Sequence, residues 1–245
     1  MYEIVNESND ILINLFFKLH MGINVDEIAS RIEHTLLKPD TIYQEIEKLC
    51  KEVQDNNFAC VCVLPYFAGY SRSILVKREK VCTVIGFPLG ASFVFSKMDE
   101  CVHALRNGAG EIDMVINIAA LLAHDFRTVS TEISSVVDIA HNTLAKVKVI
   151  VETCLLTEQQ KIDVSKIVSD SGADYIKTST GFSHGGATLH DVALLRKYSH
   201  EKVKIKASGG IKTAQFAIEL INAGADRIGT SSGVKIIQEL NSMNT

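Results

Sequence analysis

The sequence predicts an α/β fold, a single (β/α)8 TIM barrel with an N-terminal helical extension. The chain has 245 residues, close to the about 250 that this fold typically contains. Short β-rich runs alternate with longer amphipathic stretches, and strict alternation implies parallel strands joined by right-handed crossovers. Eight such units in this length favour a closed barrel. An open, doubly wound α/β sheet is the alternative fold.

The first expected element is a helical segment within residues 1–30, where Ile11, Leu12, Leu15 and Phe16 recur at helical spacing. We expect this segment to cap the bottom of the barrel, and oligomer contacts are its alternative role. No linker rich in Pro, Gly or Ser divides the chain, so residues 1–245 are predicted to form one domain. The eight predicted strands, each followed by a helix or by a loop and helix, are residues 32–37, 58–64, 81–87, 111–116, 147–152, 174–179, 203–208 and 226–230.

Composition and charge restrict the class of partner. Hydrophobic residues make up 47% of the chain and charged residues 22%, a balance that supports a packed core and argues against disorder. The formal net charge is −4, without basic clusters, so we expect no nucleic-acid or membrane-surface partner. No apolar run approaches the roughly 20 residues of a membrane span.

The cysteines and histidines predict no disulfide scaffold and no metal site. None of the six cysteines forms a CxxC pair, so we expect reduced, mostly buried thiols in a cytoplasmic protein. The chain opens with the polar and acidic residues Met1-Tyr2-Glu3, unlike a signal peptide. No pair of the eight histidines has metal-ligand spacing.

Several predicted strands carry charges where a barrel should be apolar. Side chains alternate between the two faces of a strand, and the aliphatic face must pack against the helices. The charged face therefore points into the barrel, where unpaired charge is costly and paired charge tunes pKa values. Glu111 or Lys204 alone would indicate a solvated strand end, but four strands contributing both signs predict a site. The residues concerned are Glu111 and Asp113 in the fourth strand, Lys148 and Glu152 in the fifth, Lys177 in the sixth, and Lys204 and Lys206 in the seventh.

Two lysines and an acid in one interior predict Schiff-base chemistry. A lysine amine forms an imine with a carbonyl group only when it is neutral, and burial or a neighbouring cation favours the neutral state. Lys177 and Lys206 fall on adjacent predicted strands at similar depth, so each can serve as the other's cation. Asp113 can then move protons. An iminium is an electron sink, so the set suits C–C bond cleavage or formation beside a carbonyl, without a metal or another cofactor.

Glycine-rich loops after the last two predicted strands indicate a phosphate site. Ser208-Gly209-Gly210 ends the seventh strand, and Gly229-Thr230-Ser231-Ser232-Gly233 ends the eighth. Phosphate sites of TIM barrels are often built from these two loops, with backbone N–H groups at a helix N-terminus. Either loop alone would indicate only a turn, but the pair predicts phosphate binding.

Six motifs, in order, resemble those of a known family. Ile176-Lys177-Thr178-Ser179-Thr180-Gly181-Phe182 is similar to the Schiff-base lysine motif of deoxyribose-phosphate aldolases. Residues 204–211 resemble the second-lysine strand of that family, and residues 111–117 resemble its aspartate strand. Residues 33–39, 60–65 and 86–90 are similar to further family segments, so the resemblance covers about residues 32–233.

The resemblance implies reversible cleavage of 2-deoxy-D-ribose 5-phosphate to acetaldehyde and D-glyceraldehyde 3-phosphate. Lys177 would carry the imine, Lys206 would lower its pKa and hold the proton network, and Asp113 would move protons. The phosphate of this small-molecule substrate would bind through backbone N–H groups, and Thr180 and Cys62 would line the pocket. The alternative for Cys62 is a small buried thiol that packs within its strand. The phosphate-binding residues implied are Gly209, Gly210, Ser231 and Ser232, and the other substrate-binding residues are Glu33, Cys62, Thr180 and Lys148. A homo-oligomer, either a dimer or a tetramer, is also expected.

The chain departs from the family pattern at three positions. Glu33 stands where aspartate is usual and is one methylene longer. Lys212 replaces a common arginine, which keeps the charge but loses bidentate geometry. Lys204 occupies a position that is often small or apolar, and it needs an acidic partner if it faces inward.

Two other functions are alternatives to this assignment. One is another Schiff-base aldolase or transaldolase that acts on a different phosphosugar. The other is a non-catalytic phosphate-binding barrel, although a pure binder has no need for the buried like charges of Lys177 and Lys206.

Overall fold

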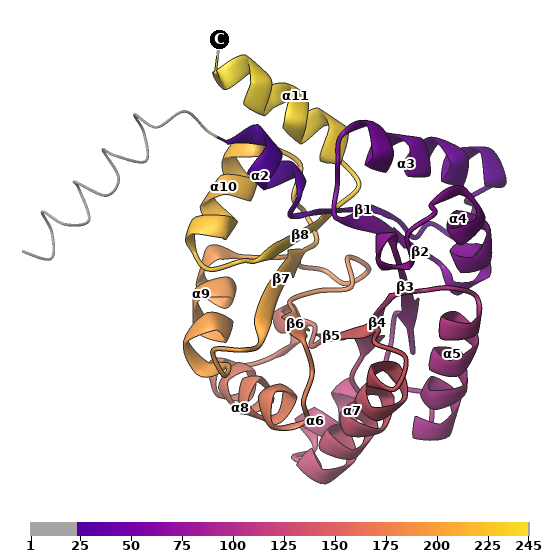
Figure 1. Ribbon diagram of the computed structural model, residues 1–245. Helices are drawn as coiled ribbons and strands as arrows, with labels where there is room; N and C mark the ends of the chain where they lie inside the picture. Colours follow the sequence, from indigo (N-terminus) through magenta and orange to yellow (C-terminus); the bar gives the residue numbers. More distant parts are fainter. Residues whose placement is uncertain (1–23, 245) are drawn as a thin grey trace, which may run out of the picture.

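The computed structural model describes residues 24–244, which form a closed barrel of eight parallel strands surrounded by helices (Figure 1). The strands pair in chain order, and β1 closes the barrel against β8 through pairs such as Glu33 with Gly229. Closure confirms the predicted TIM barrel and excludes the open sheet. The strands are β1 (Ile32–Leu36), β2 (Cys60–Val63), β3 (Val81–Ile85), β4 (Glu111–Val115), β5 (Lys146–Ile150), β6 (Tyr175–Lys177), β7 (Lys204–Ser208) and β8 (Arg227–Thr230).

Helices cover the outside of the barrel between consecutive strands (Figure 1). Of the predicted N-terminal helical segment, the structure describes α2 (Val25–Ala29), while residues 1–23 lie outside the described residues. No helix within residues 24–244 is long and apolar enough to cross a membrane. The other helices are α3 (Tyr43–Asp55), α4 (Ala68–Ile74), α5 (Val94–Arg106), α6 (Ile118–Leu122), α7 (Phe126–His141), α8 (Glu158–Asp170), α9 (Leu189–Tyr198), α10 (Ala214–Asn222) and α11 (Gly233–Met243), with short 3-10 turns η1 (Pro65–Phe67), η2 (Arg78–Lys80) and η3 (Thr153–Leu155).

Side-chain caps fix where several outer helices begin. At the start of α8, Thr157 accepts a hydrogen bond from the backbone N–H of Gln160, whose side chain accepts one from the N–H of Thr157. Thr188 caps α9 and Thr213 caps α10 with one such bond each. A cap of this kind is worth about 1 kcal/mol. Because each of these helices follows a loop at the carboxyl end of a strand, the caps also anchor the loops around the barrel mouth.

The main core lies between the outer faces of the strands and the inner faces of the helices. Ile112 and Met114 on β4, and Val149 on β5, are fully buried there. Burial of a side chain of this size stabilises a fold by about 1.5–3 kcal/mol. The intervening residues Asp113 and Lys148 are as deeply buried but contact each other inside the barrel, as the alternation of the sequence predicts.

Strand register aligns the interior charges in pairs. Asp113 on β4 lies beside Lys148 on β5, and Lys177 on β6 lies beside Lys206 on β7. Each pair therefore comes from adjacent strands at one level of the barrel.

Of the residues on the predicted charged strand face, one lies in a loop and one lies at a solvated strand end. β5 ends at Ile150, and Glu152 follows with a left-handed backbone (φ 54°), so it belongs to the loop rather than to the strand. Lys204 at the start of β7 is exposed, with its Nζ 5.9 Å from the ring centroid of Tyr175. Lys204 therefore needs no acidic partner inside the barrel.

Candidate active site

Lys177, Lys206 and Asp113 meet inside the barrel. The Oδ2 atom of Asp113 accepts hydrogen bonds from the Nζ of Lys177 at 2.7 Å and from the Nζ of Lys206 at 2.6 Å. The side chain of Lys177 is 3% exposed, and those of the other two are fully buried. Lys177 is the last residue of β6, which places it at the carboxyl end of the strand, where chemistry occurs in this fold.

The charge state of Asp113 and Lys206 is set by their contacts rather than by solvent. Burial alone would raise the pKa of Asp113, but Lys148, Lys177 and Lys206 hold this pKa well below its usual value. Burial alone would lower the pKa of Lys206, but Asp113 and Glu33 raise it well above its usual value. Asp113 is therefore a carboxylate and Lys206 an ammonium group at neutral pH.

A second layer of charges lies next to this trio, toward the amino ends of the strands. Lys148 donates to Asp113 Oδ1 at 3.0 Å and pairs with Glu111 Oε2 at 2.6 Å. The Nη1 of Arg227 lies 3.1 Å from Glu33 Oε1 and 3.4 Å from Glu111 Oε2. Glu33 also accepts a hydrogen bond from Lys206. A continuous set of ion pairs thus connects Asp113 with the first residue of β8.

Thiols and carboxylates in this interior lie close enough to suggest a metal site. One ligand atom from each of Glu33, Cys62, Cys82 and Asp113 falls within 4.8 Å of the others. The two thiols differ, because a hydrogen bond with Cys82 lowers the pKa of Cys62 whereas burial raises the pKa of Cys82 well above its usual value. Both oxygens of Asp113, however, already accept hydrogen bonds from lysines. Metals bind thiolates and unengaged carboxylates, so the donor chemistry here fits an ion-paired cluster better than a metal centre.

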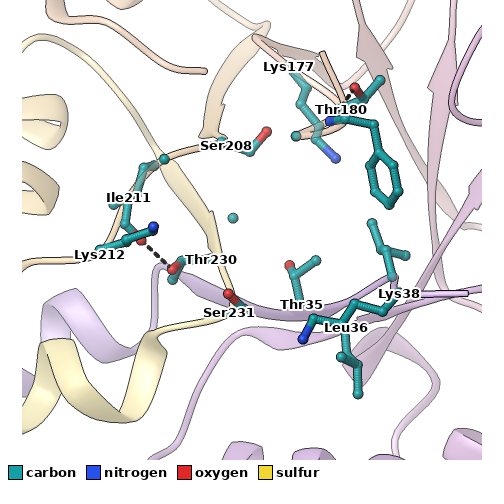
Figure 2. A pocket seen from close by; sticks show the side chains of 16 residues that line it. Thr35, Leu36, Lys38, Lys177, Thr180, Ser208, Ile211, Lys212, Thr230 and Ser231 are labelled. Atoms are coloured by element: carbon teal, nitrogen blue, oxygen red, sulfur yellow. Dashed lines mark hydrogen bonds between the residues drawn. The ribbon is translucent and has the colours of Figure 1, made fainter. Parts of the chain in front are cut away.

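A cavity of about 280 Å³ opens beside Lys177 at the barrel mouth (Figure 2). Of the lysines in the buried cluster, Lys177 is the one that lines it. Lys38 and Lys212 line it from different sides, with Thr180 near Lys177. The lining residues come from the carboxyl ends of β1, β6, β7 and β8 and from the loops that follow them, and are Thr35, Leu36, Leu37, Lys38, Lys177, Thr180, Gly181, Phe182, Ser208, Gly209, Gly210, Ile211, Lys212, Gly229, Thr230 and Ser231.

The two glycine-rich loops form one part of the cavity wall. Gly209 and Gly210 have φ angles of 88° and 77°, a region that disfavours any residue with a Cβ. A Cβ on Gly209 would also come 2.9 Å from the Cα of Gly186. Ser231 lines the cavity from the loop after β8, whereas Ser232 does not line it and donates its backbone N–H to Thr230 Oγ1 at 2.9 Å.

Residues 24–239 match the DeoC/LacD family of aldolases. The chain belongs to this family. A deoxyribose-phosphate aldolase from Brevibacillus brevis is 52% identical over 207 residues, which are 84% of this chain and 93% of the relative. One from Thermococcus kodakarensis is 48% identical over 219 residues, 88% of this chain and 98% of the relative. Among solved structures, an aldolase named QR15 has a TM-score of 0.83 at 40% identity, covering 90% of this chain and 97% of its own. A tetrameric deoxyribose phosphate aldolase from Aeropyrum pernix has a TM-score of 0.82 at 34% identity, covering 90% and 93%.

In this DeoC/LacD aldolase the predicted site residues occupy two levels. The cavity level holds Thr180 together with Lys177 and the glycine loops. The hydroxyl group of Thr180 donates a hydrogen bond to Glu152 and accepts a hydrogen bond from the backbone N–H of Phe182 at 3.1 Å. The buried level holds Glu33, Cys62 and Lys148, which are fully buried, do not line the cavity and surround Asp113 and Lys206.

The structure adds Arg227 and Lys38 to the predicted site of this DeoC/LacD aldolase and places Glu152 differently from the prediction. Arg227 lies in the strand predicted at residues 226–230. The alternation that places Ile228 on the outer face of this strand places Arg227 on the inner face, so the sequence does contain the evidence for an interior arginine. Glu152 was placed on the strand face, and its carboxylate instead orders the loop at Thr180. Lys38 lines the cavity from the loop after β1, and nothing in the pattern of that loop predicts where its side chain points.

Proposed function

We propose that this protein is a deoxyribose-phosphate aldolase, which reversibly cleaves 2-deoxy-D-ribose 5-phosphate to acetaldehyde and D-glyceraldehyde 3-phosphate. Relatives at 52% and 48% identity over most of the chain carry that name. The observation that carries the mechanism is that Lys177 lines the cavity, whereas Lys148 and Lys206 are fully buried behind it. An amine must reach the cavity to attack a carbonyl carbon held there.

The proposed reaction uses Lys177 as the nucleophile. Its Nζ attacks C1 of the open-chain sugar, and loss of water gives an imine. The protonated imine accepts the electron pair of the C2–C3 bond while the C3 hydroxyl loses its proton, so D-glyceraldehyde 3-phosphate leaves and an enamine remains. Protonation of the enamine at C2 and hydrolysis then release acetaldehyde and the free amine. Asp113 and Lys206 would carry these protons, because they are hydrogen-bonded to each other and to Lys177.

The phosphate group would bind at the glycine loops. Gly209, Gly210 and Ser231 line the cavity there, and backbone N–H groups near a helix N-terminus attract anions. Ser232, which precedes α11, would contribute to this anion-attracting end. Lys212 would supply a positive charge on the same side, and Lys38 is a second cation available to the substrate from across the cavity. Thr180 would contact a substrate hydroxyl, while Glu33, Cys62 and Lys148 would act on the substrate through the buried layer.

Borohydride trapping tests this proposal directly. Incubation with 2-deoxyribose 5-phosphate and sodium borohydride, followed by peptide mass analysis, should give a reduced adduct on Lys177. Lys177→Ala should abolish the adduct and the turnover, while the control Lys204→Ala, which removes an exposed lysine of β7, should leave both unchanged. A folded wild-type protein that yields no adduct would contradict the assignment.

A substrate panel separates the proposed activity from its alternatives. Cleavage of ketose phosphates in preference to deoxyribose 5-phosphate would indicate a different phosphosugar aldolase or a transaldolase. Phosphosugar binding without any turnover would indicate a non-catalytic barrel.

Assembly and location are proposed on separate grounds. A homo-oligomer, dimer or tetramer, is supported by the relative described as tetrameric and by exposed aromatic residues such as Tyr66, Phe93 and Phe95, since exposed apolar surface often marks interfaces. Light scattering would measure the mass. A single domain is supported by the one closed barrel that the described residues form. A location in the cytoplasm is supported by the six free cysteines, which suit a reducing compartment.

A further inference from the structure

The second charge layer contains two residues that the proposed reaction does not use. Arg227 on β8 and Glu111 on β4 lie 3.4 Å apart, measured from Nη1 to Oε2. Arg227 also holds Glu33 at 3.1 Å, and Glu111 holds Lys148 at 2.6 Å. Neither residue lines the cavity. They contact the reacting groups only through Glu33 and Lys148.

The interior cluster carries an excess of positive charge. It contains four cationic side chains (Lys148, Lys177, Lys206 and Arg227) and three carboxylates (Glu33, Glu111 and Asp113). Three of the cations contact at least two carboxylates each, whereas Lys177 pairs only with Asp113 among the residues that the structure describes. Because burial penalises net charge, the excess bears most directly on Lys177, the cation of the cluster with the fewest carboxylate partners.

We infer that Arg227 and Glu111 are positioning residues that set the pH range in which Lys177 can react, by fixing the net charge of the barrel interior and the position of Glu33. The inference rests on the proposed function, because it concerns the amine that attacks the substrate. With Arg227 the cluster has one more positive charge than negative charges, and without Glu111 this excess would be larger by one. Lys148 links Glu111 to Asp113 and belongs to the same positioning layer.

The thiol and the hydroxyl group that neighbour Arg227 and Glu111 add no charge of their own at neutral pH. Burial raises the pKa of the Cys60 thiol well above its usual value and also raises the pKa of the Tyr175 hydroxyl, so both groups are neutral at physiological pH. Lys204, near Tyr175, is exposed and screened by solvent. The titratable and charged groups that face Arg227 are Glu33, Glu111, Cys60 and Tyr175. Those that face Glu111 are Lys148, Arg227, Cys60 and Lys206. Those that face Lys177 are Asp113, Lys206 and Cys62.

Neutralising the two residues must therefore shift the pH profile in opposite directions. Arg227→Met removes a positive charge, which favours the protonated amine and moves the acidic limb of kcat/KM to higher pH. Glu111→Gln removes a negative charge, which favours the neutral amine and moves the same limb to lower pH. Each shift should be on the order of one pH unit, or tenfold in kcat/KM at a fixed pH on the limb.

The experiment measures kcat/KM for deoxyribose 5-phosphate against pH in the two variants, in Arg227→Lys and in the wild type. Arg227→Lys keeps the charge and should restore the wild-type limb. The matched control is Glu132→Gln, which breaks the buried ion pair of Lys97 and Glu132 (2.6 Å) between α5 and α7, outside the barrel. It should lower stability without moving the limb.

The outcomes separate the inference from the proposed function. Opposite shifts with an unmoved control limb support the inference, because loss of packing alone would not give opposite signs. Unmoved limbs, or limbs that move in the same direction in both variants, would overturn it. If Arg227→Met does not fold, the isosteric Glu111→Gln still decides through the sign of its shift. A wild-type protein without the Lys177 adduct refutes the proposed function itself, independently of these profiles.

Discussion

Removal of Lys206 tests whether its charge makes the neighbouring amine reactive. In Lys206→Met the buried ammonium group is lost, while an unbranched side chain of similar length remains. The Nζ atoms of Lys177 and Lys206 lie 2.7 Å and 2.6 Å from the same oxygen of Asp113, so they are at most about 5 Å apart. Two like charges at ~5 Å with an effective dielectric constant of about 20 repel by roughly 3 kcal/mol, which corresponds to about two pH units.

The pH dependence of kcat/KM measures this effect. We expect the acidic limb of Lys206→Met to move to higher pH by about two units, with roughly 100-fold lower activity at neutral pH and partial recovery in alkali. Lys204→Met is the control, because this lysine lies on the same strand but is exposed. Loss of a buried partner should also destabilise the fold by about 3–5 kcal/mol, so folding is checked by urea denaturation. An activity profile of the folded variant that keeps the wild-type limb would refute the reasoning.

Two further predictions concern Asp113. Asp113→Asn keeps the size of the side chain but cannot accept a proton, so it should still bind substrate while turnover falls at least about 100-fold; full turnover measured by aldehyde release would remove Asp113 from the proton path. For stability, the pKa of Asp113 lies well below its usual value in the folded protein despite burial, because Lys148, Lys177 and Lys206 surround it. The ionised Asp113 therefore contributes to the free energy of unfolding above about pH 3.9, the usual pKa of an aspartate in an unfolded chain. That contribution is lost as the pH falls through the lower pKa that Asp113 has in the folded protein. The wild-type urea midpoint should fall steeply below about pH 4, and Asp113→Asn should reduce that dependence; equal slopes in the two proteins would contradict the predicted linkage.

Local periodicity was enough to predict the barrel and much of its charged interior. The faces of β4 and β5 follow from alternation within a few residues, and the sequence therefore placed Asp113 and Lys148 inside. Burial and the Asp113–Lys148 hydrogen bond confirm that placement. The predicted ends of elements were less accurate: the strand predicted at residues 58–64 is Cys60–Val63 in the structure. Strand ends depend on pairing with neighbours that are distant in sequence, which local periodicity does not show.

Partners across the barrel could not be predicted from one strand at a time. Glu33 on β1 meets Lys206 on β7 and Arg227 on β8 because the closed barrel brings the first and last strands together. The departure from the usual aspartate at position 33 has a structural counterpart, since the glutamate carboxylate contacts three cations, including Lys148 at 3.4 Å. Loop positions such as Lys38 follow no period, so no pattern could place that side chain at the cavity.

Depth in the barrel gives three lysines three different environments. Lys148 is paired in register with Tyr175, two residues before Lys177 on β6, and it contacts all three interior carboxylates. Lys206 is level with Lys177 but is fully buried and bonds to two carboxylates. Lys177 has one carboxylate partner and ends its strand at the cavity. Lys177, the lysine with the fewest carboxylate partners, is therefore also the one of the three that reaches the cavity.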